Sequence, residues 1–310
     1  MVDKMLNFDI LFDDRLERFI TNRDFLMSNE YVLSIINDYE DKVWRYNVFS
    51  EFIWNNIIET ALSKKERDAL IDTHYSALIE SAKNLRLTDS EQDFSKGSEI
   101  AEIALYGILK HHYKALSIVP KIFYKQNTND NTKGADSVHI ILNDEGNDFS
   151  LWFGEAKFYN SINDSNLSKI INSVNELLQS EKIKKENNII TNLKDIELCI
   201  TDNVLCKKII ETLSSEMSLD YIRPKLHIPI FLLYECTITA KYTEKSEEYV
   251  KEIIDYHKDR AEAYFRKQIN MLSAMPKYEN VQFHLIIFPI PNKKKIVEEF
   301  TEQAKIFKGK

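Results

Sequence analysis

The sequence has few of the residues that dominate fibrous, flexible or disulfide-bonded proteins. Six glycines and six prolines among 310 residues are too few for a collagen-like or low-complexity chain. Its three cysteines, Cys199, Cys206 and Cys236, are an odd number without C-x-x-C spacing, which predicts reduced thiols and no metal site. No run approaches the roughly 18 apolar residues of a membrane span, and Met1–Leu6 lacks the pattern of a secretory signal. We therefore expect a cytoplasmic globular protein that crosses no membrane.

The chain also lacks a net positive charge. The chain carries 41 basic and 49 acidic residues, a net charge of −8. Residues 1–60 hold six bases and twelve acids, a net −6, so the remaining 250 residues hold only −2. Affinity for nucleic-acid phosphates comes from clustered Lys and Arg. If this protein acts on nucleic acid, we expect a partner to help deliver it.

The first third of the sequence has the spacing of helices. Apolar residues recur at helical intervals over 32–44, 49–58 and 70–85, with no Pro or Gly before Gly97. Thr88-Asp89-Ser90 is a helix start signal, with Ser90 and Asp93 placed as a weak capping box. We predict a helical N-terminal subdomain over residues 1–88 and a further helix over 91–112.

The rest of the chain alternates between strand and helix patterns, with no internal repeat. The expected strands are 116–124 (an edge strand, because it contains Pro120), 138–142, 150–159, 228–242 in its apolar first part, and 281–290. The expected helices are 165–180, 203–216, 246–273 and 293–307. Residues 89–310 are therefore predicted to form an α/β core, in which helices flank a mixed central sheet.

Three residues carry the strongest chemical signal. Asp136 opens one predicted hairpin strand, and Glu155 lies near the middle of the next. Glu155 and Lys157 are two apart in a strand, so they project from one face, whereas Gly154 and Ala156 face the other side and leave room for a helix. Two carboxylates on rigid strands are ligands for Mg²⁺, and a neighbouring lysine can hold the attacking water or offset phosphoryl charge.

An acid-x-Lys triplet is uninformative by itself. The chain has a second one at Glu40, inside a helical pattern where residues two apart do not share a face. The triplet at Glu155 lies in a strand that follows an Asp-bearing strand and a helix with Glu99 and Glu102. The alternative interpretation is a surface Glu–Lys pair beside an Asp at a strand start.

This order of motifs resembles the PD-(D/E)XK nuclease superfamily, with Gly134-Ala135-Asp136 in place of its Pro-Asp. A closer resemblance, over most of the chain, is to the HamA family, the nuclease subunits of the Hachiman anti-phage defence system. It rests on three segments: Lys96–Gly107 (KGSEIAEIALYG), Lys133–Asp136 (KGAD) and Trp152–Tyr159 (WFGEAKFY). The resemblance implies a restriction-endonuclease-like core, a DNA substrate and a HamB-like superfamily-two helicase as partner, which would supply the grip on DNA that this chain lacks.

The resemblance also implies roles for individual residues. Asp136 and Glu155 would be metal ligands, helped by the Ala156 carbonyl, and Lys157 would be the catalytic lysine. The helix acid is either Glu99 or Glu102, and the deeper place of Glu102 in the helix favours it. The cation would be Mg²⁺, with Mn²⁺ as the alternative, in a metal-dependent deoxyribonuclease that hydrolyses phosphodiester bonds.

Two other functions fit parts of the sequence. Arg67 and His74 match the loose Arg-x(four to six)-His pattern of HEPN-type ribonucleases, which need no metal, and their spacing would place them on one helix face. A catalytically silent partner-binding subunit is the other alternative, although the intact Asp136, Glu155 and Lys157 argue against it. The sequence leaves open endo- or exonucleolytic cutting, strand preference, the activating trigger and the stoichiometry with the helicase.

Three further features favour structural roles or stay open. His111 and His112 close a helix, where imidazoles cap the negative end more often than they bind metal. Glu235, in an apolar strand, would lie either beside the site or at a helicase interface. The lysines of the last predicted helix, 293–307, are most simply a solvated face.

Overall fold

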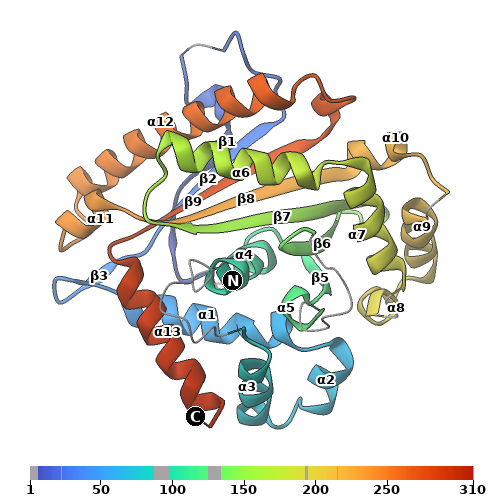
Figure 1. Cartoon of the computed structure of the whole chain (residues 1–310), viewed down its shortest axis with the longest axis horizontal. Coiled ribbons are helices and arrows are strands. Elements are labelled where there is room, and N and C mark those ends of the chain that lie inside the picture. The colour runs from blue at the N-terminus through green and yellow to red at the C-terminus, as the bar shows by residue number, and fades with distance from the viewer. Residues whose placement is uncertain are drawn as a thin grey trace.

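A seven-stranded mixed sheet forms the centre of the protein (Figure 1). The computed structural model describes residues 6–21, 23–86, 98–124, 134–192, 195–214 and 216–309. The strand order is β1-β2-β9-β8-β7-β6-β5. Strands β2, β9, β8 and β7 are parallel, whereas β1, β6 and β5 each pair antiparallel with their inner neighbour. This confirms the α/β fold with a mixed central sheet flanked by helices.

The strands of this sheet are β1 (Asp9–Arg15), β2 (Glu30–Ile36), β5 (Leu116–Val119), β6 (Ser137–Leu142), β7 (Phe149–Tyr159), β8 (Leu226–Glu235) and β9 (Gln282–Ile290). A separate small hairpin pairs β3 (Tyr39–Glu40) with β4 (Val43–Trp44). The strands β8 and β9 are apolar along nearly their whole length because both faces of these central parallel strands are covered. The strand predicted over 116–124 lies at an edge of the sheet, as β5, but it ends at Val119 before Pro120, and residues 121–124 are helical.

One helical layer covers each face of the sheet (Figure 1). One layer contains α1 (Tyr46–Ala61), α4 (Ser98–His111) and α13 (Lys293–Phe307), with α2 (Lys64–Ala69) and α3 (His74–Lys83) at its outer side. The other contains α6 (Asp164–Leu177) and α12 (Glu247–Leu272), flanked by α7 (Ser180–Asn192), α8 (Asp195–Cys199), α9 (Asn203–Leu213) and α10 (Leu219–Ile222). The short helices α5 (Lys121–Tyr124) and α11 (Thr237–Lys241) follow β5 and β8. Three 3₁₀ turns complete the described elements: Leu16–Arg18, Arg223–Lys225 and Tyr278–Asn280.

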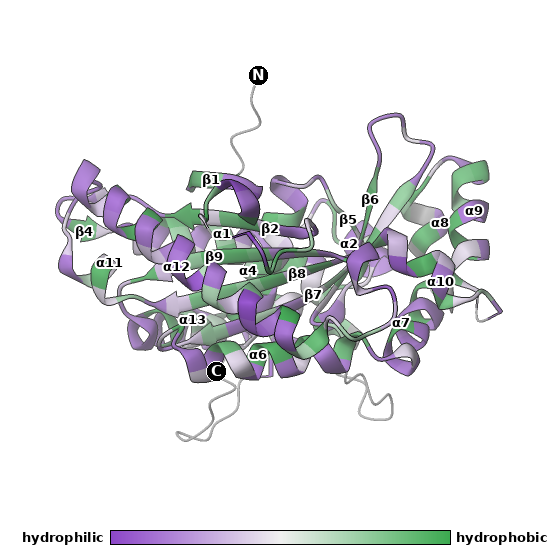
Figure 2. Ribbon diagram, turned by 90° about the horizontal axis from the view of Figure 1, so that it is seen from above, coloured by the Kyte–Doolittle hydropathy of each residue, from purple (hydrophilic) through white to green (hydrophobic). Residues whose placement is uncertain are grey.

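Hydropathy separates these layers clearly (Figure 2). Apolar residues fill the strands, and hydrophilic residues mark the outward sides of the helices. Within the described ranges, no helix combines the length and the apolar character that a bilayer crossing requires. Cys199, Cys206 and Cys236 form no disulfide, as the sequence predicts.

The N-terminal segment differs from its prediction. The helix predicted over 32–44 is wrong: residues 30–36 form the buried strand β2, which with β1 extends the central sheet, and residues 39–44 form the β3–β4 hairpin. A short apolar run has no spacing that separates a buried strand from a buried helix, and here pairing with β9 decides for the strand. The helical prediction holds for α1, α2 and α3. The predicted helix start over 88–93 and the domain boundary at residue 88 lie outside the described residues.

Replacing Gly154 would test how closely α4 packs on β7. A Cβ added to Gly154 would lie 2.7 Å from Leu105 Cδ2 of α4 and 2.2 Å from Ser137 Oγ. We expect Gly154→Ala to lower the free energy of unfolding by about 1–3 kcal/mol, because the buried side chains of Ser137 and Leu105 must move to admit the methyl group. Denaturant unfolding measures this. Gly146→Ala is the control, since nothing lies within 4 Å of its added Cβ, and its left-handed φ of +68° should cost about 1 kcal/mol.

Candidate active site

The β6–β7 hairpin places Asp136 beside Glu155. Ser137 pairs with Gly154 across the hairpin, and the Asp136 amide donates to the Gly154 carbonyl at 2.8 Å. The Ala156 amide in turn donates to Asp136 Oδ2 at 3.1 Å. Asp136 is therefore fixed to the backbone of β7 at both its main chain and its carboxylate.

Lys157 connects the two acids. Its ammonium group donates a hydrogen bond to Glu155 Oε1 and lies 3.8 Å from Asp136 Oδ2. The side chains differ in exposure: 8% for Glu155, 16% for Asp136 and 31% for Lys157. The three predicted residues thus form one group, in which the lysine is the part most open to solvent.

Burial gives this group unusual proton affinities. Burial of Glu155, with the nearby negative charge of Asp136, raises its pKa to about 7, although Lys157 opposes the shift. Burial alone would lower the pKa of Lys157, but Asp136 and Glu155 outweigh it and raise that pKa above its ordinary value. Lys157 therefore stays protonated at neutral pH, and one lysine does not fully balance two carboxylates.

The two acids of this group, Asp136 and Glu155, line a cleft of about 240 Å³ under α6 and α7. Its walls contain Gly134, Asp136, Glu155, Ser173, Glu176, Leu177 and Lys182. Ser173 and Glu176 are three apart on α6, the helix that directly follows β7, and Glu176 is exposed at the rim. Sequence reasoning missed both. The available signal was their helical spacing just after the Glu-x-Lys strand, which places them on one face of the next helix.

The two candidate helix acids lie on α4, in the layer against the other face of β7. That face presents Trp152, Ala156 and Phe158, with Gly154 against Leu105 of α4. Glu102 is buried at 6% exposure, and Glu99 accepts a hydrogen bond from the Arg86 amide at 2.8 Å. In the part of the chain that the structure describes, no three His, Cys, Asp or Glu side chains form a metal-binding group. Glu99 and Glu102 therefore stay predictions as ligands.

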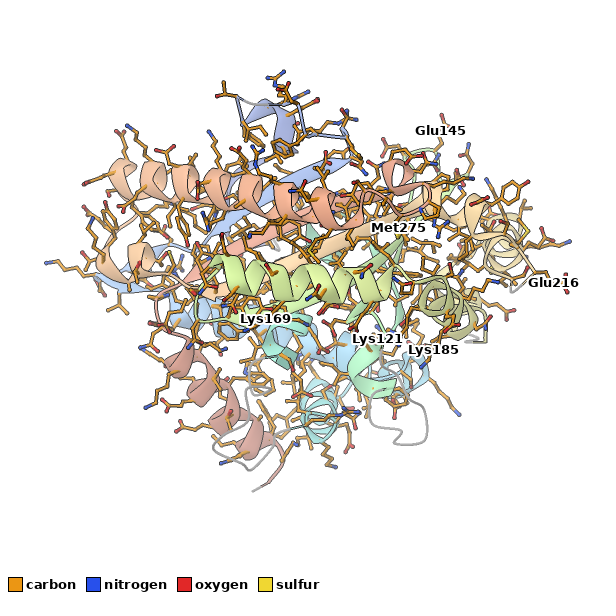
Figure 3. All side chains as sticks on the ribbon, turned by 45° about the horizontal axis from the view of Figure 1, so that its top comes forward. Lys121, Glu145, Lys169, Lys185, Glu216 and Met275 are labelled. Carbon is orange, nitrogen blue, oxygen red and sulfur yellow. The ribbon has the colours of Figure 1, made fainter. Side chains whose placement is uncertain are left out.

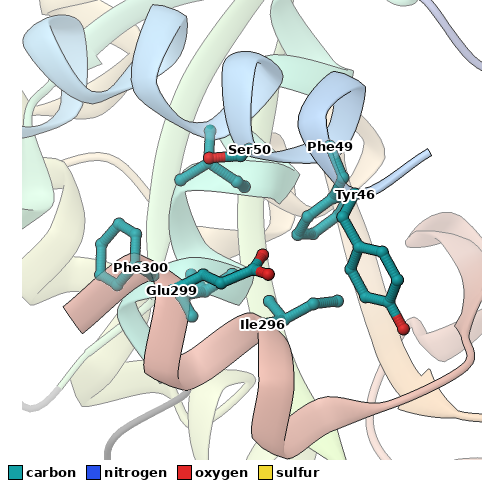
Figure 4. A pocket seen from close by; sticks show the side chains of 8 residues that line it. Tyr46, Phe49, Ser50, Ile296, Glu299 and Phe300 are labelled. Atoms are coloured by element: carbon teal, nitrogen blue, oxygen red, sulfur yellow. The ribbon is translucent and has the colours of Figure 1, made fainter. Parts of the chain in front are cut away.

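A second, much smaller hollow lies between α1, α4 and α13 (Figure 4). Tyr46, Phe49 and Phe300 line it, with Ser50 and Glu299 as polar groups. Its volume of about 10 Å³ is the size of one water molecule. The cleft at Glu155 is therefore the better candidate for a substrate.

The residues of the ribonuclease alternative do not form a site. Arg67 lies on α2, where its guanidinium is 4.0 Å from Glu59, and His74 is an exposed residue at the start of α3. The prediction that they share one helix face is wrong because the chain turns between two short helices.

The other polar residues singled out in the sequence have structural partners. The ring of His111 meets Asn56 and that of His112 meets Asp13, with no metal-binding group around them among the described residues. Glu235 accepts a hydrogen bond from the Lys293 amide at 2.7 Å and so holds the start of α13.

Comparison with known protein families identifies one that covers most of the chain. The model of the protein family HamA matches residues 13–304, which includes every element of the sheet except the first residues of β1. No curated protein matches the chain.

The raised pKa of Glu155 predicts a pH-dependent stability. The unfolded carboxyl has the ordinary pKa of 4.5, so the folded state is penalised for ionising Glu155 as pH rises from 4.5 through about 7. Without divalent cations, Glu155→Gln should therefore be more stable than the unchanged protein at pH 8, by about 1–3 kcal/mol, and nearly equal to it at pH 4.5.

Urea unfolding in EDTA at both pH values measures this difference. Glu211→Gln is the matched control, since Glu211 is an exposed acid outside the cleft, 3.7 Å from Lys207. A Glu155→Gln difference that is the same at both pH values would contradict the prediction.

Proposed function

Because the family match spans most of its length, the chain belongs to the HamA family of Hachiman defence proteins, and we propose that it is a metal-dependent DNA nuclease. It would serve as the effector subunit of a two-component anti-phage complex and hydrolyse phosphodiester bonds. The proposal includes membership of the PD-(D/E)XK superfamily. The observation that carries it is the grouping of Asp136, Glu155 and Lys157, whose two acids line one cleft.

The donor set fits a hard divalent cation. Mg²⁺ binds one or two carboxylates and completes its octahedron with waters and phosphate oxygens. Asp136 and Glu155 provide two carboxylates whose negative charge Lys157 only partly balances. Under this proposal both acids, with the Ala156 carbonyl, hold Mg²⁺ or Mn²⁺, and Glu102 or Glu99 contributes from α4.

The protein's own residues then have distinct tasks. The bound cation would neutralise charge on the phosphodiester and lower the pKa of an attacking water. Lys157, being protonated, cannot act as a base. It donates hydrogen bonds, and so orients the water and offsets charge that develops on the phosphoryl oxygens. Its side chain is 31% exposed while it is paired with Glu155.

A partner helicase fits the charge of this chain. The net charge of −8 disfavours a large phosphate-binding surface. We propose that a HamB-like superfamily-two helicase grips the DNA and presents it to the cleft. Control of cutting would then depend on the complex and not on the affinity of this subunit for DNA.

The nuclease proposal predicts metal-dependent cleavage. Purified chain, with and without its candidate helicase, is incubated with linear and circular DNA in Mg²⁺ or EDTA. We expect cutting only in Mg²⁺, and its loss in Glu155→Ala because one of the two ligand carboxylates is gone. The matched control, Glu211→Ala, changes an exposed acid away from the cleft and should cut normally.

Three other results have clear meanings. Cutting that persists in EDTA would point to a metal-independent nuclease. Cutting of RNA alone would overturn the choice of substrate. No cutting under any condition, with intact complex formation, would favour a catalytically silent partner-binding subunit.

Replacing Lys157 should separate binding of the metal from chemistry. Lys157→Ala removes a hydrogen-bond donor but no ligand, so Mg²⁺ affinity should stay within about threefold while the cleavage rate falls by about 10²-fold or more. Calorimetry and single-turnover cleavage measure the two effects. If Lys157→Ala and Glu155→Ala lost metal affinity equally, the separate role of Lys157 would be wrong.

A further inference from the structure

A buried ion pair holds the loop that carries Asp136. Glu186 of α7 and Lys121 of α5 lie 2.5 Å apart between Oε2 and Nζ, and their side chains are 1% and 4% exposed. The other oxygen of Glu186, Oε1, accepts a hydrogen bond from the Ala135 amide at 2.9 Å. Figure 3 labels Lys121, and also Lys185, the neighbour of Glu186 on α7. One carboxylate therefore ties α5, α7 and the residue before Asp136 together.

The small residues Gly134 and Ala135 leave room for the Glu186 carboxylate in this loop. A Cβ on Gly134 would lie 1.8 Å from Glu186 Oε1, so only glycine lets the carboxylate approach the Ala135 amide. Ala135 itself is completely buried. The glycine two residues before Asp136 is thus explained by packing, because it lets the Glu186 carboxylate reach the Ala135 amide.

The contacts on the two sides of Asp136 complement each other. On one side, β7 holds its amide and its carboxylate through Gly154 and Ala156. On the other side, Glu186 holds the amide of Ala135. The backbone is therefore fixed immediately before and at Asp136, which limits how far its carboxylate can move relative to Glu155.

Stability alone is a poor reason to bury these charges. Replacing a buried ion pair with apolar residues of similar volume is often neutral or stabilising, because both charges lose their hydration. If the ion pair serves to position other residues, it must make a contact that two apolar side chains cannot make. Here that is to accept the hydrogen bond of the Ala135 amide.

We infer that Glu186, with Lys121 as its charge partner, is a positioning residue that sets the place of Asp136 for cation binding. The inference rests on the proposed function, since it concerns the same site. It also gives α7 a second task, because Lys182, one turn before Glu186, lines the cleft. The position at which α7 packs would then determine both the position of the Asp136 loop and that of the cleft wall formed by Lys182.

Two double variants separate positioning from stability. Lys121→Met with Glu186→Gln removes both charges but keeps an oxygen that can accept from Ala135. Lys121→Met with Glu186→Leu removes the charges and the acceptor. The two differ only at residue 186, where Gln has an amide group and Leu is apolar, and neither carries a charge, so unpaired charge does not confuse the comparison.

Calorimetry with Mn²⁺, urea unfolding and amide hydrogen exchange of residues 134–136 are measured for both variants and for the unchanged protein. We expect the Gln variant to bind Mn²⁺ within about threefold of the unchanged protein, and the Leu variant to bind at least about tenfold more weakly. Both should remain folded. The Ala135 and Asp136 amides should lose protection only in the Leu variant.

The outcomes distinguish this inference from the proposed function. If the unchanged protein bound no Mn²⁺, the metal-dependent function would fail, whereas amide protection would still support or overturn the hold of Glu186 on the loop. If the unchanged protein bound Mn²⁺ and the Leu variant bound it equally, positioning by Glu186 would be wrong. Equal amide protection in both variants would overturn it as well.

Discussion

The pairing register between β6 and β7 is the constraint on which the candidate site depends. Because Ser137 lies opposite Gly154, Asp136 lies next to Glu155. A shift of the pairing by one residue would place the two acids on opposite faces of the sheet. The same register points Gly154 and Ala156 at α4, where their small size admits the helix. Packing of the helix and placement of the acids are therefore two consequences of one alternation along β7.

Charge at the site is held at a cost to stability. Two carboxylates lie in a largely buried group with a single lysine, which is why the pKa of Glu155 is raised. The surrounding structure keeps them there through backbone contacts to Asp136 and the Glu186–Lys121 pair. Buried negative charge that the protein balances only in part is common at sites that bind a cation or a substrate. It is consistent with the function proposed for this HamA protein.

The two edges of the sheet are protected in different ways. The outer strand β1 carries Asp9, Asp13 and Asp14, and charged residues discourage pairing with another chain. On the far edge, α7 and α8 pack against the short strand β5. The edge near the candidate site is thus covered partly by α7, which also lines the cleft, and the acidic edge lies at the opposite end of the strand order.

Long periodic segments were determined by the sequence itself. The pattern of 246–273 predicted α12, that of 281–290 predicted β9, and strand alternation placed Glu155 and Lys157 on one face. Short segments were decided by tertiary pairing: 30–36 is a strand because β9 lies beside it. Glu186 and Lys121 meet beside the Asp136 loop only through packing of helices distant in the chain, and no local spacing encodes such a meeting. The local sequence pattern thus predicted that Asp136, Glu155 and Lys157 lie together, whereas long-range packing determined which other residues surround them.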